Sequence, residues 1–143
     1  MLRTVLLIIG ISSLLCCGCQ KTLPATVNGT ITIDDKPLPE GKNITGEVML
    51  YPVGGGAAAY GTIGAGGRYV VQTGGTQGLE PGEYKVTVRV VEVAPEPPGG
   101  YQNAPGQKVI SPRRYQDREK SELVVDVKAG SNRIDLNLTS TPR

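Results

Sequence analysis

Apolar residues recur at every second position in several stretches of this chain, and this period of two restricts its fold more than any other feature. The clearest stretch is residues 78–93, GLEPGEYKVTVRVVEV. In it apolar side chains alternate with polar ones: Tyr84, Val86, Val88 and Val90 against Lys85, Thr87 and Arg89. Such alternation is typical of a β-strand with one buried face, because successive side chains point to opposite sides of a strand. No segment shows the 3.6-residue period of an amphipathic helix, so the sequence predicts an all-β fold.

Turn residues separate the predicted strands. Pro81-Gly82 suits the centre of a type II turn, because Pro presets its φ and Gly accepts the positive φ that follows. We expect the hydroxyl of Tyr84 to reach the backbone near this turn, as in a tyrosine corner. Gly29 interrupts an alternating run and is predicted to be a bulge or a point of close packing. The predicted strands lie at residues 27–33, 47–51, 60–63, 68–73, 84–91, 123–127 and 134–138.

The N-terminus has the pattern of a secretory signal. Arg3 precedes a mostly apolar stretch, residues 5–15, which is too short to span a bilayer, since a spanning helix needs about 20 residues. Gly18 and Cys19 follow, and this stretch resembles the bacterial lipobox, in which cleavage occurs before a cysteine that becomes lipidated. We therefore expect residues 1–18 to be a lipoprotein signal peptide, Cys19 to carry the lipid anchor, residues 19–25 to form a tether, and residues 26–140 to form one domain. Cleavage before Cys17 remains the alternative.

The three cysteines all lie within residues 16–19, and the chain has no His. A zinc or redox site would need a partner elsewhere in the sequence, and none is available. No metal site and no cofactor are therefore expected. The formal net charge of +2 arises from interleaved basic and acidic residues, which creates no strong field for nucleic acid.

A long Pro-rich segment at residues 94–118 interrupts the strand pattern and is predicted to be a loop. Four of its residues are candidate binding residues, because aromatic rings can stack on a sugar or a peptide and arginines can add charge: Tyr101, Arg113, Arg114 and Tyr115. The structural alternative is that these tyrosines attach the loop to the domain and that the basic residues form a solvated face.

Three motifs carry a family resemblance. They are V-x-G-x-I-x-x-D-x-K-P-L at residues 27–38, G-R-Y at 67–69, and G-L-x-P-G-x-Y-x-V-x-V at 78–88. Together they resemble the transthyretin-like modules called carboxypeptidase regulatory-like domains, and with the lipobox they are similar to small lipoproteins abundant in planctomycetes. The resemblance implies a seven-stranded, two-sheet Greek-key sandwich. One enzyme with this fold, hydroxyisourate hydrolase, depends on histidines and a Tyr-Arg-Gly-Ser terminus, whereas this chain lacks His and ends Ser140-Thr141-Pro142-Arg143.

The sequence contains no arrangement that supports catalysis. Ser121 and Ser131 have no His to activate them, and no G-x-S-x-G motif occurs. We expect a lipid-anchored, extracytoplasmic structural or interaction module that is not an enzyme. It would lie in the bacterial cell envelope, at the outer membrane or on a periplasmic or extracellular face, with an unknown protein or glycan as partner. The alternative function is a carbohydrate- or peptide-binding accessory lipoprotein that uses the 94–118 loop.

Overall fold

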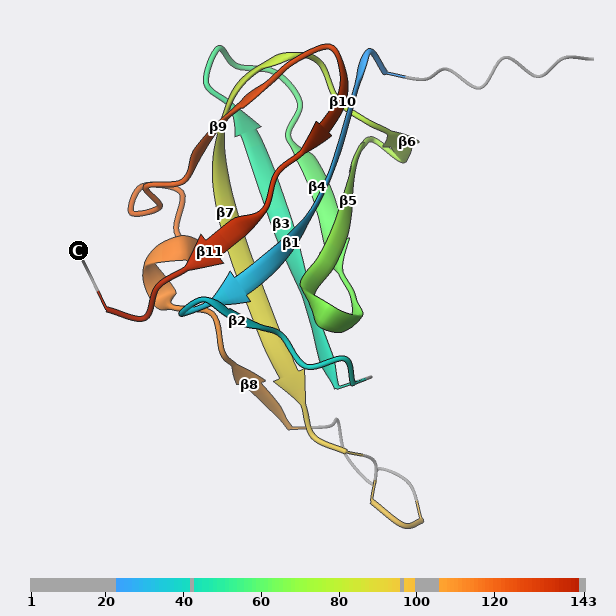
Figure 1. The fold of residues 1–143 in the computed structure, drawn as a ribbon, viewed down its shortest axis with the longest axis vertical. Helices are drawn as coiled ribbons and strands as arrows, with labels where there is room; N and C mark the ends of the chain where they lie inside the picture. The colour runs from blue at the N-terminus through green and yellow to red at the C-terminus, as the bar shows by residue number, and fades with distance from the viewer. Residues whose placement is uncertain (1–22, 42, 96, 100–105, 142–143) are drawn as a thin grey trace, which may run out of the picture.

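The computed structural model describes residues 23–41, 43–95, 97–99 and 106–141, and strands dominate them (Figure 1). The helical turns in these residues are two 3-10 helices, η1 (Ala65–Gly67) and η2 (Arg113–Gln116). The strands in the described residues are β1 (Ala25–Ile33), β2 (Lys36–Pro37), β3 (Ile44–Pro52), β4 (Ala59–Ile63), β5 (Arg68–Thr73), β6 (Thr76–Gln77), β7 (Gly82–Val93), β8 (Gln107–Val109), β9 (Val124–Val127), β10 (Gly130–Arg133) and β11 (Leu136–Leu138). The prediction of an all-β fold is confirmed.

β7 is the longest strand, and its alternating sequence explains its central position. Its inward side chains, Tyr84, Val86, Val88 and Val90, are at most 4% exposed. β3 pairs with one edge of β7 in antiparallel register, from Pro52 opposite Tyr84 to Ile44 opposite Glu92. β9 and β8 pair with the other edge, near the beginning and the end of β7 respectively. The strand therefore has partners on both edges and one buried face.

β1 organises the other part of the sheet. It pairs antiparallel with β2 and β5, and parallel with β10 and β11. Gly29, in the middle of β1, lies where the chain passes from β10 to β11, and a Cβ atom at this position would be 1.8 Å from the carbonyl oxygen of Ile134. The prediction that Gly29 is a point of close packing is confirmed.

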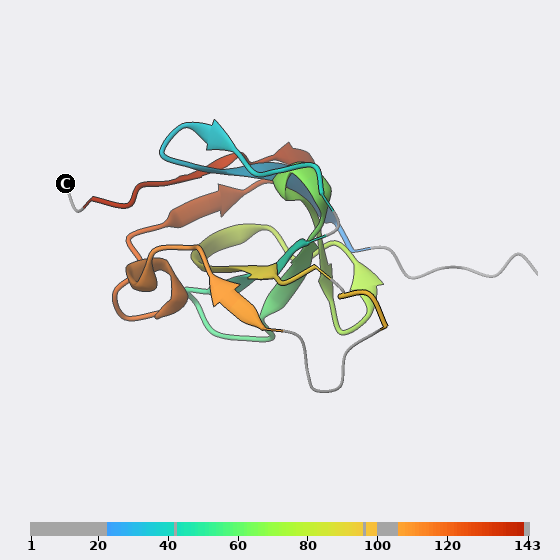
Figure 2. The same cartoon turned by 90° about the horizontal axis from the view of Figure 1, so that it is seen from below.

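The strands join in the order β10-β1-β5-β4-β3-β7-β8, with β2, β6, β9 and β11 attached beside this path. The sheet curls, so that β1, β2 and β11 lie over β7 and β8 (Figure 2). The space between them is filled by one apolar core, whose largest fully buried side chains are Ile31, Leu50, Ile63, Leu79, Leu138, Val27, Val48, Val71, Val86, Val88, Val90 and Val127. The two-sheet Greek-key arrangement of seven strands stays a prediction.

The predicted loop at residues 94–118 contains regular structure in its second half. β8 pairs with the end of β7, and η2 follows four residues later. Ser111 anchors the connection, because its Oγ accepts a hydrogen bond from the amide of Val90 at 3.0 Å. Ser121 then donates to the carbonyl oxygen of Val86. The segment from residue 107 onward is thus attached along β7, which corrects the expectation of an unstructured loop there.

β1 begins at Ala25, one residue before the predicted domain of residues 26–140. Ala25, expected to end the tether, is the first residue of β1, is fully buried and exchanges backbone hydrogen bonds with Leu79. β1 begins near one end of the molecule. The C-terminal end of β7 lies at the opposite end, together with β8 (Figure 1). A strand of 12 residues spans about 40 Å, so β7 sets the distance between these ends. No helix in the described part of the chain has the length and apolar character needed to cross a membrane.

Candidate functional site

Two of the predicted binding residues, Arg114 and Tyr115, lie together in η2 and face the C-terminal strand. Tyr115 is 7% exposed, and its hydroxyl accepts a hydrogen bond from the amide of Thr139 at 3.2 Å. Arg114 lies over the Tyr115 ring, with its Cζ 4.7 Å from the ring centroid. Its Nη2 donates to the Tyr115 hydroxyl at 3.1 Å, to Thr139, and to the carbonyl oxygen of Thr141 at 3.0 Å. These residues therefore tie η2 to the end of β11.

The electrostatics of this cluster agree with an internal role. Burial raises the pKa of the Tyr115 hydroxyl, but the hydrogen bonds from Thr139 and Arg114 outweigh it, and the pKa lies below the usual value. The Nη2 of Arg114 and the hydroxyl of Tyr115 both form hydrogen bonds within the chain. This is the arrangement in which an aromatic residue attaches the loop to the domain.

The other candidate residues are placed differently or not at all. Arg113 is exposed beside Arg114 and has no ion pair within the described residues. Tyr101, Cys17 and Cys19 lie outside the described residues. The structure thus brings Arg114 and Tyr115 together, with Tyr115 in the core and Arg114 bonded to Thr139 and Thr141.

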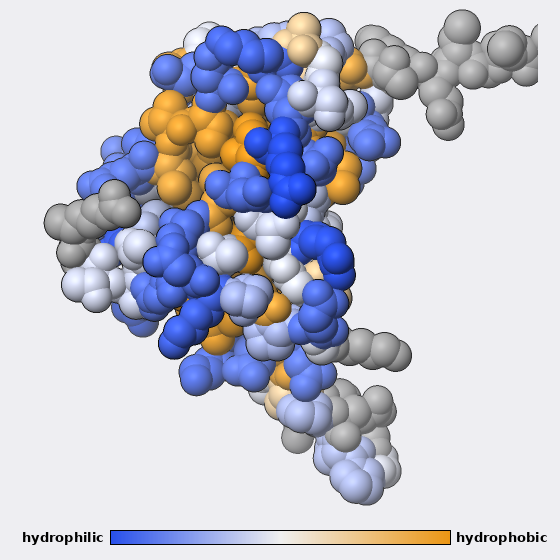
Figure 3. Space-filling view, viewed as in Figure 1, coloured by the Kyte–Doolittle hydropathy of each residue, from blue (hydrophilic) through white to orange (hydrophobic). Residues whose placement is uncertain are grey.

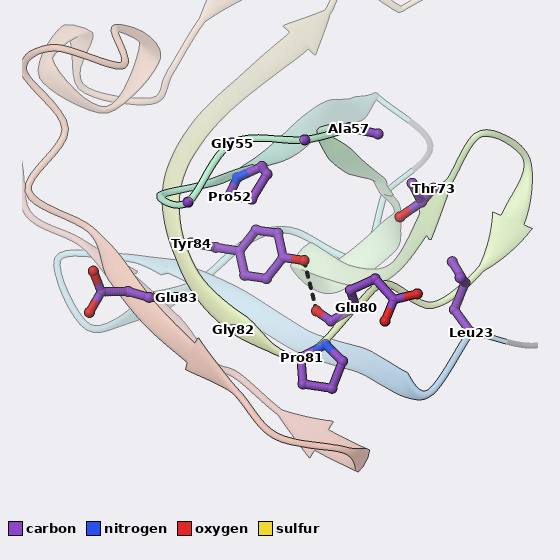
Figure 4. Close-up of a pocket in the computed structure, with 12 residues that line it drawn as sticks. Leu23, Pro52, Gly55, Ala57, Thr73, Glu80, Pro81, Gly82, Glu83 and Tyr84 are labelled. Atoms are coloured by element: carbon purple, nitrogen blue, oxygen red, sulfur yellow. Dashed lines mark hydrogen bonds between the residues drawn. The ribbon is translucent and has the colours of Figure 1, made fainter.

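A cleft of about 360 Å³ lies at the end of the molecule where β1 begins (Figure 4). Leu23, Pro52 and Pro81 contribute apolar walls, and the glycines of residues 54–56 form one side. The hydroxyl of Tyr84 donates to the carbonyl oxygen of Glu80 at 2.7 Å, so the predicted tyrosine corner is confirmed. Burial and the nearby Glu80 carboxylate raise the pKa of Tyr84.

The chemistry available in this cleft is limited. The Glu80 side chain lies on the Leu23 side of the cleft, whereas Glu83 points away from Tyr84 (Figure 4). No group of three or more His, Cys, Asp or Glu side chains that could hold a metal ion occurs among the residues the structure describes. The cleft is therefore a surface hollow whose ionisable side chains are Glu80, Glu83 and Tyr84.

Sequence reasoning missed a third place, on the outer face of the sheet. Four outward side chains form a row across β3, β4, β5 and β6, which we call the outer row: Met49, Tyr60, Gln72 and Gln77. The sequence predicted a strand at residues 60–63 but not the direction of the Tyr60 side chain. It also gave no signal of which residues lie beside Tyr60, because that depends on the register between strands.

The face shown in Figure 3 also carries apolar surface over β9. In this strand Val125 is partly buried and Val124 is 54% exposed.

No protein-family model, curated protein or solved structure matches this chain. The function must therefore be inferred from the residues themselves.

Proposed function

We propose that the protein is a lipid-anchored, extracytoplasmic module with a structural or interaction role and no catalytic activity. The anchor would be Cys19, with residues 1–18 removed as a signal peptide. Support comes from the apolar stretch before Gly18 and from the absence of any cysteine or histidine beyond residue 19 that could pair with the thiol. The cell envelope of a bacterium, at the outer membrane or on a periplasmic or extracellular face, is the corresponding location.

The observation that carries this proposal is the position of the two ends of the fold. Cys19 precedes Leu23 by four residues, which extend over at most about 14 Å. A lipid on Cys19 would therefore hold the end of the molecule that contains Leu23 and the cleft close to the membrane. The β7–β8 hairpin lies at the other end (Figure 1), and would be displayed about 40 Å farther from the bilayer.

We also propose that the curled sheet is a transthyretin-like, two-layer sandwich of the carboxypeptidase regulatory-like kind. Its layers would be the strands around β1 and the strands around β7, with the shared core between them. Two residues of the motifs support this assignment through their roles: Gly29 at the crossing with Ile134, and Tyr84 at the corner with Glu80. A fold of this type serves many functions, so the assignment by itself names no activity.

The alternative function, carbohydrate or peptide binding by the 94–118 segment, has less support. Tyr115 is buried and Arg114 is bound to the C-terminal strand, so two of the four candidate residues already have partners in the chain. Arg113 and Tyr101 are the remaining candidates for that site.

The anchor is tested by replacing each cysteine in turn in the full chain, expressed in a bacterial host. We expect Cys19→Ala to abolish labelling with radioactive palmitate and to move the protein into the aqueous phase of a detergent partition. Cys17→Ala should leave both properties unchanged. Labelling that survives Cys19→Ala would refute the assignment, and labelling lost only with Cys17→Ala would transfer the anchor to Cys17.

The orientation is tested with a fluorophore attached at either end of the molecule. Ala57→Cys places the label at the rim of the cleft, and Pro98→Cys places it beyond β7; both positions are exposed. A quencher carried on lipid headgroups should quench the label at position 57 more strongly than the label at position 98. Equal quenching, or the reverse order, would contradict the proposed orientation.

A further inference from the structure

The outer row is a straight line of side chains made by strand register. Met49 lies opposite Tyr60, Tyr60 opposite Gln72, and Gln72 opposite Gln77. Neighbouring strands are about 4.8 Å apart, so the row spans about 14 Å from β3 to β6. Side chains at directly opposite positions are close enough to act together on one ligand.

The polar groups of the outer row are available. Tyr60 is 37% exposed. Among the described residues, no hydrogen bond engages the Tyr60 hydroxyl or the side-chain amides of Gln72 and Gln77. Beside the row is a surface hollow of about 610 Å³, lined by Gln72, Gln77, Thr62 and Val70 among others. Gln72 and Gln77 thus line the hollow, and the exposed ring of Tyr60 lies on the neighbouring strand opposite Gln72.

The charges around the row indicate an uncharged ligand. The outer row contains no Asp, Glu, Lys, Arg or His, and Arg68, which also lines the hollow, forms an ion pair with Glu40 at 3.1 Å. In the neighbouring row, Glu47 lies opposite Arg89, so their charges compensate. An anionic or a cationic ligand would therefore meet no net opposite charge at this surface.

We propose that the outer row and the adjacent hollow bind a neutral oligosaccharide. One sugar ring would place its C–H face on the ring of Tyr60, whose π face carries partial negative charge. The amides of Gln72 and Gln77 would donate to and accept from hydroxyl groups, since each amide offers both functions in one plane. The inference rests on the proposal that the protein is an interaction module, and it moves the glycan site from the 94–118 segment to the sheet.

The test uses the purified full chain in a detergent without sugar groups. Neutral pentasaccharides of glucose, xylose and N-acetylglucosamine are titrated against it, with oligogalacturonate as the acidic comparison. We expect one neutral glycan to shift the NMR signals of Tyr60, Gln72 and Gln77. Tyr60→Ala should weaken binding about tenfold or more, as for other exposed aromatic anchors. Gln77→Ala, at an exposed strand end, should weaken it with no loss of folding, which keeps the test valid if Tyr60→Ala fails to fold.

Tyr101→Ala is the matched control, because it removes a tyrosine from the alternative site and should leave affinity unchanged. The inference is overturned if no neutral glycan binds at millimolar concentration, or if binding survives both Tyr60→Ala and Gln77→Ala. Preference for the acidic glycan, or loss of affinity only with Tyr101→Ala, would also overturn it. Palmitate labelling of Cys19 is measured independently, so failure here is distinguishable from failure of the proposed anchor.

Discussion

Gly29→Ala should destabilise the protein strongly, although it adds a single methyl group. The new Cβ would lie 1.8 Å from the carbonyl oxygen of Ile134 and 2.6 Å from its carbonyl carbon, whereas real Cβ contacts are essentially never under 3.0 Å. The obstacle is backbone, which cannot rotate aside as a side chain can. β1 and the chain between β10 and β11 must therefore separate by about 1.2 Å, the difference between 3.0 and 1.8 Å.

Moving these two segments apart would break or weaken two hydrogen bonds at the same crossing. The hydroxyl of Tyr69 donates to the Ile134 carbonyl oxygen at 2.6 Å, and the amide of Ile134 donates to the Asn28 carbonyl oxygen at 2.8 Å. Tyr69 is 4% exposed, so losing its partner leaves a buried hydroxyl unpaired, at a cost of about 1–3 kcal/mol. With the second bond weakened, we expect a loss of about 2–4 kcal/mol in the free energy of unfolding. The melting temperature should fall by about 8–16 °C for a domain of this size.

The assay is thermal and urea unfolding of the full chain, followed by circular dichroism. Gly54→Ala is the matched control, since a Cβ at position 54 meets nothing within 4 Å, and it should change the free energy of unfolding by less than about 0.5 kcal/mol. In combination with Tyr69→Phe the effect of Gly29→Ala should be smaller than alone, because both changes remove the same hydrogen bond. Full additivity, or a stability equal to that of Gly54→Ala, would refute this account of the crossing.

Two further predictions concern the C-terminal end of the fold. The Asp34 carboxylate accepts hydrogen bonds from the Oγ of Ser140 at 2.6 Å and from its amide at 2.8 Å, which lower the pKa of Asp34. A carboxylate whose pKa is lower in the folded state stabilises the fold at pH values above its unfolded pKa of about 4, and this stabilisation is lost as the pH falls through the folded pKa. Asp34→Asn should therefore lower the melting temperature at pH 7 and match the parent protein at acidic pH. A difference in melting temperature that is constant with pH would contradict this. Arg114→Ala should cost about 1–2 kcal/mol and speed amide hydrogen exchange in β11, because it removes the donor that ties η2 to Thr139 and Thr141, just after this strand. Arg113→Ala should leave exchange unchanged, and equal effects of the two substitutions would show that Arg114 has no special role.

The parts of the fold that the sequence predicted are those encoded by neighbouring residues. The alternation around Tyr84 identified β7 and its buried face, because successive side chains of a strand point to opposite sides. Tyr84 lies only four residues after Glu80, and the hydrogen bond between them follows from that local geometry. The predicted type II turn is wrong in its detail, because Gly82 begins β7 with a φ of 151°. Gly29 was recognisable as a close approach, but Ile134 was not recognisable as its partner.

The predicted loop at residues 94–118 contains regular structure that the sequence did not predict. Prolines and scarce apolar residues indicated an irregular segment, yet β8 and η2 form within it because β7 offers a free edge. Tyr115 had two interpretations, a ligand-binding ring or an attachment to the domain. Its burial against Thr139 decided for attachment, and Thr139 is 24 residues away along the chain.

The sequence by itself determined the all-β class, the positions of most strands and the face that β7 buries. These depend on a period of two, which is a property of residues within a few positions of one another. Only the tertiary structure decided which strands are neighbours. The predicted strand at residues 134–138 became β11, and with β10 it pairs in parallel with β1. The outer row likewise exists only through register, which is set by the burial of the whole core and is therefore invisible in any one segment.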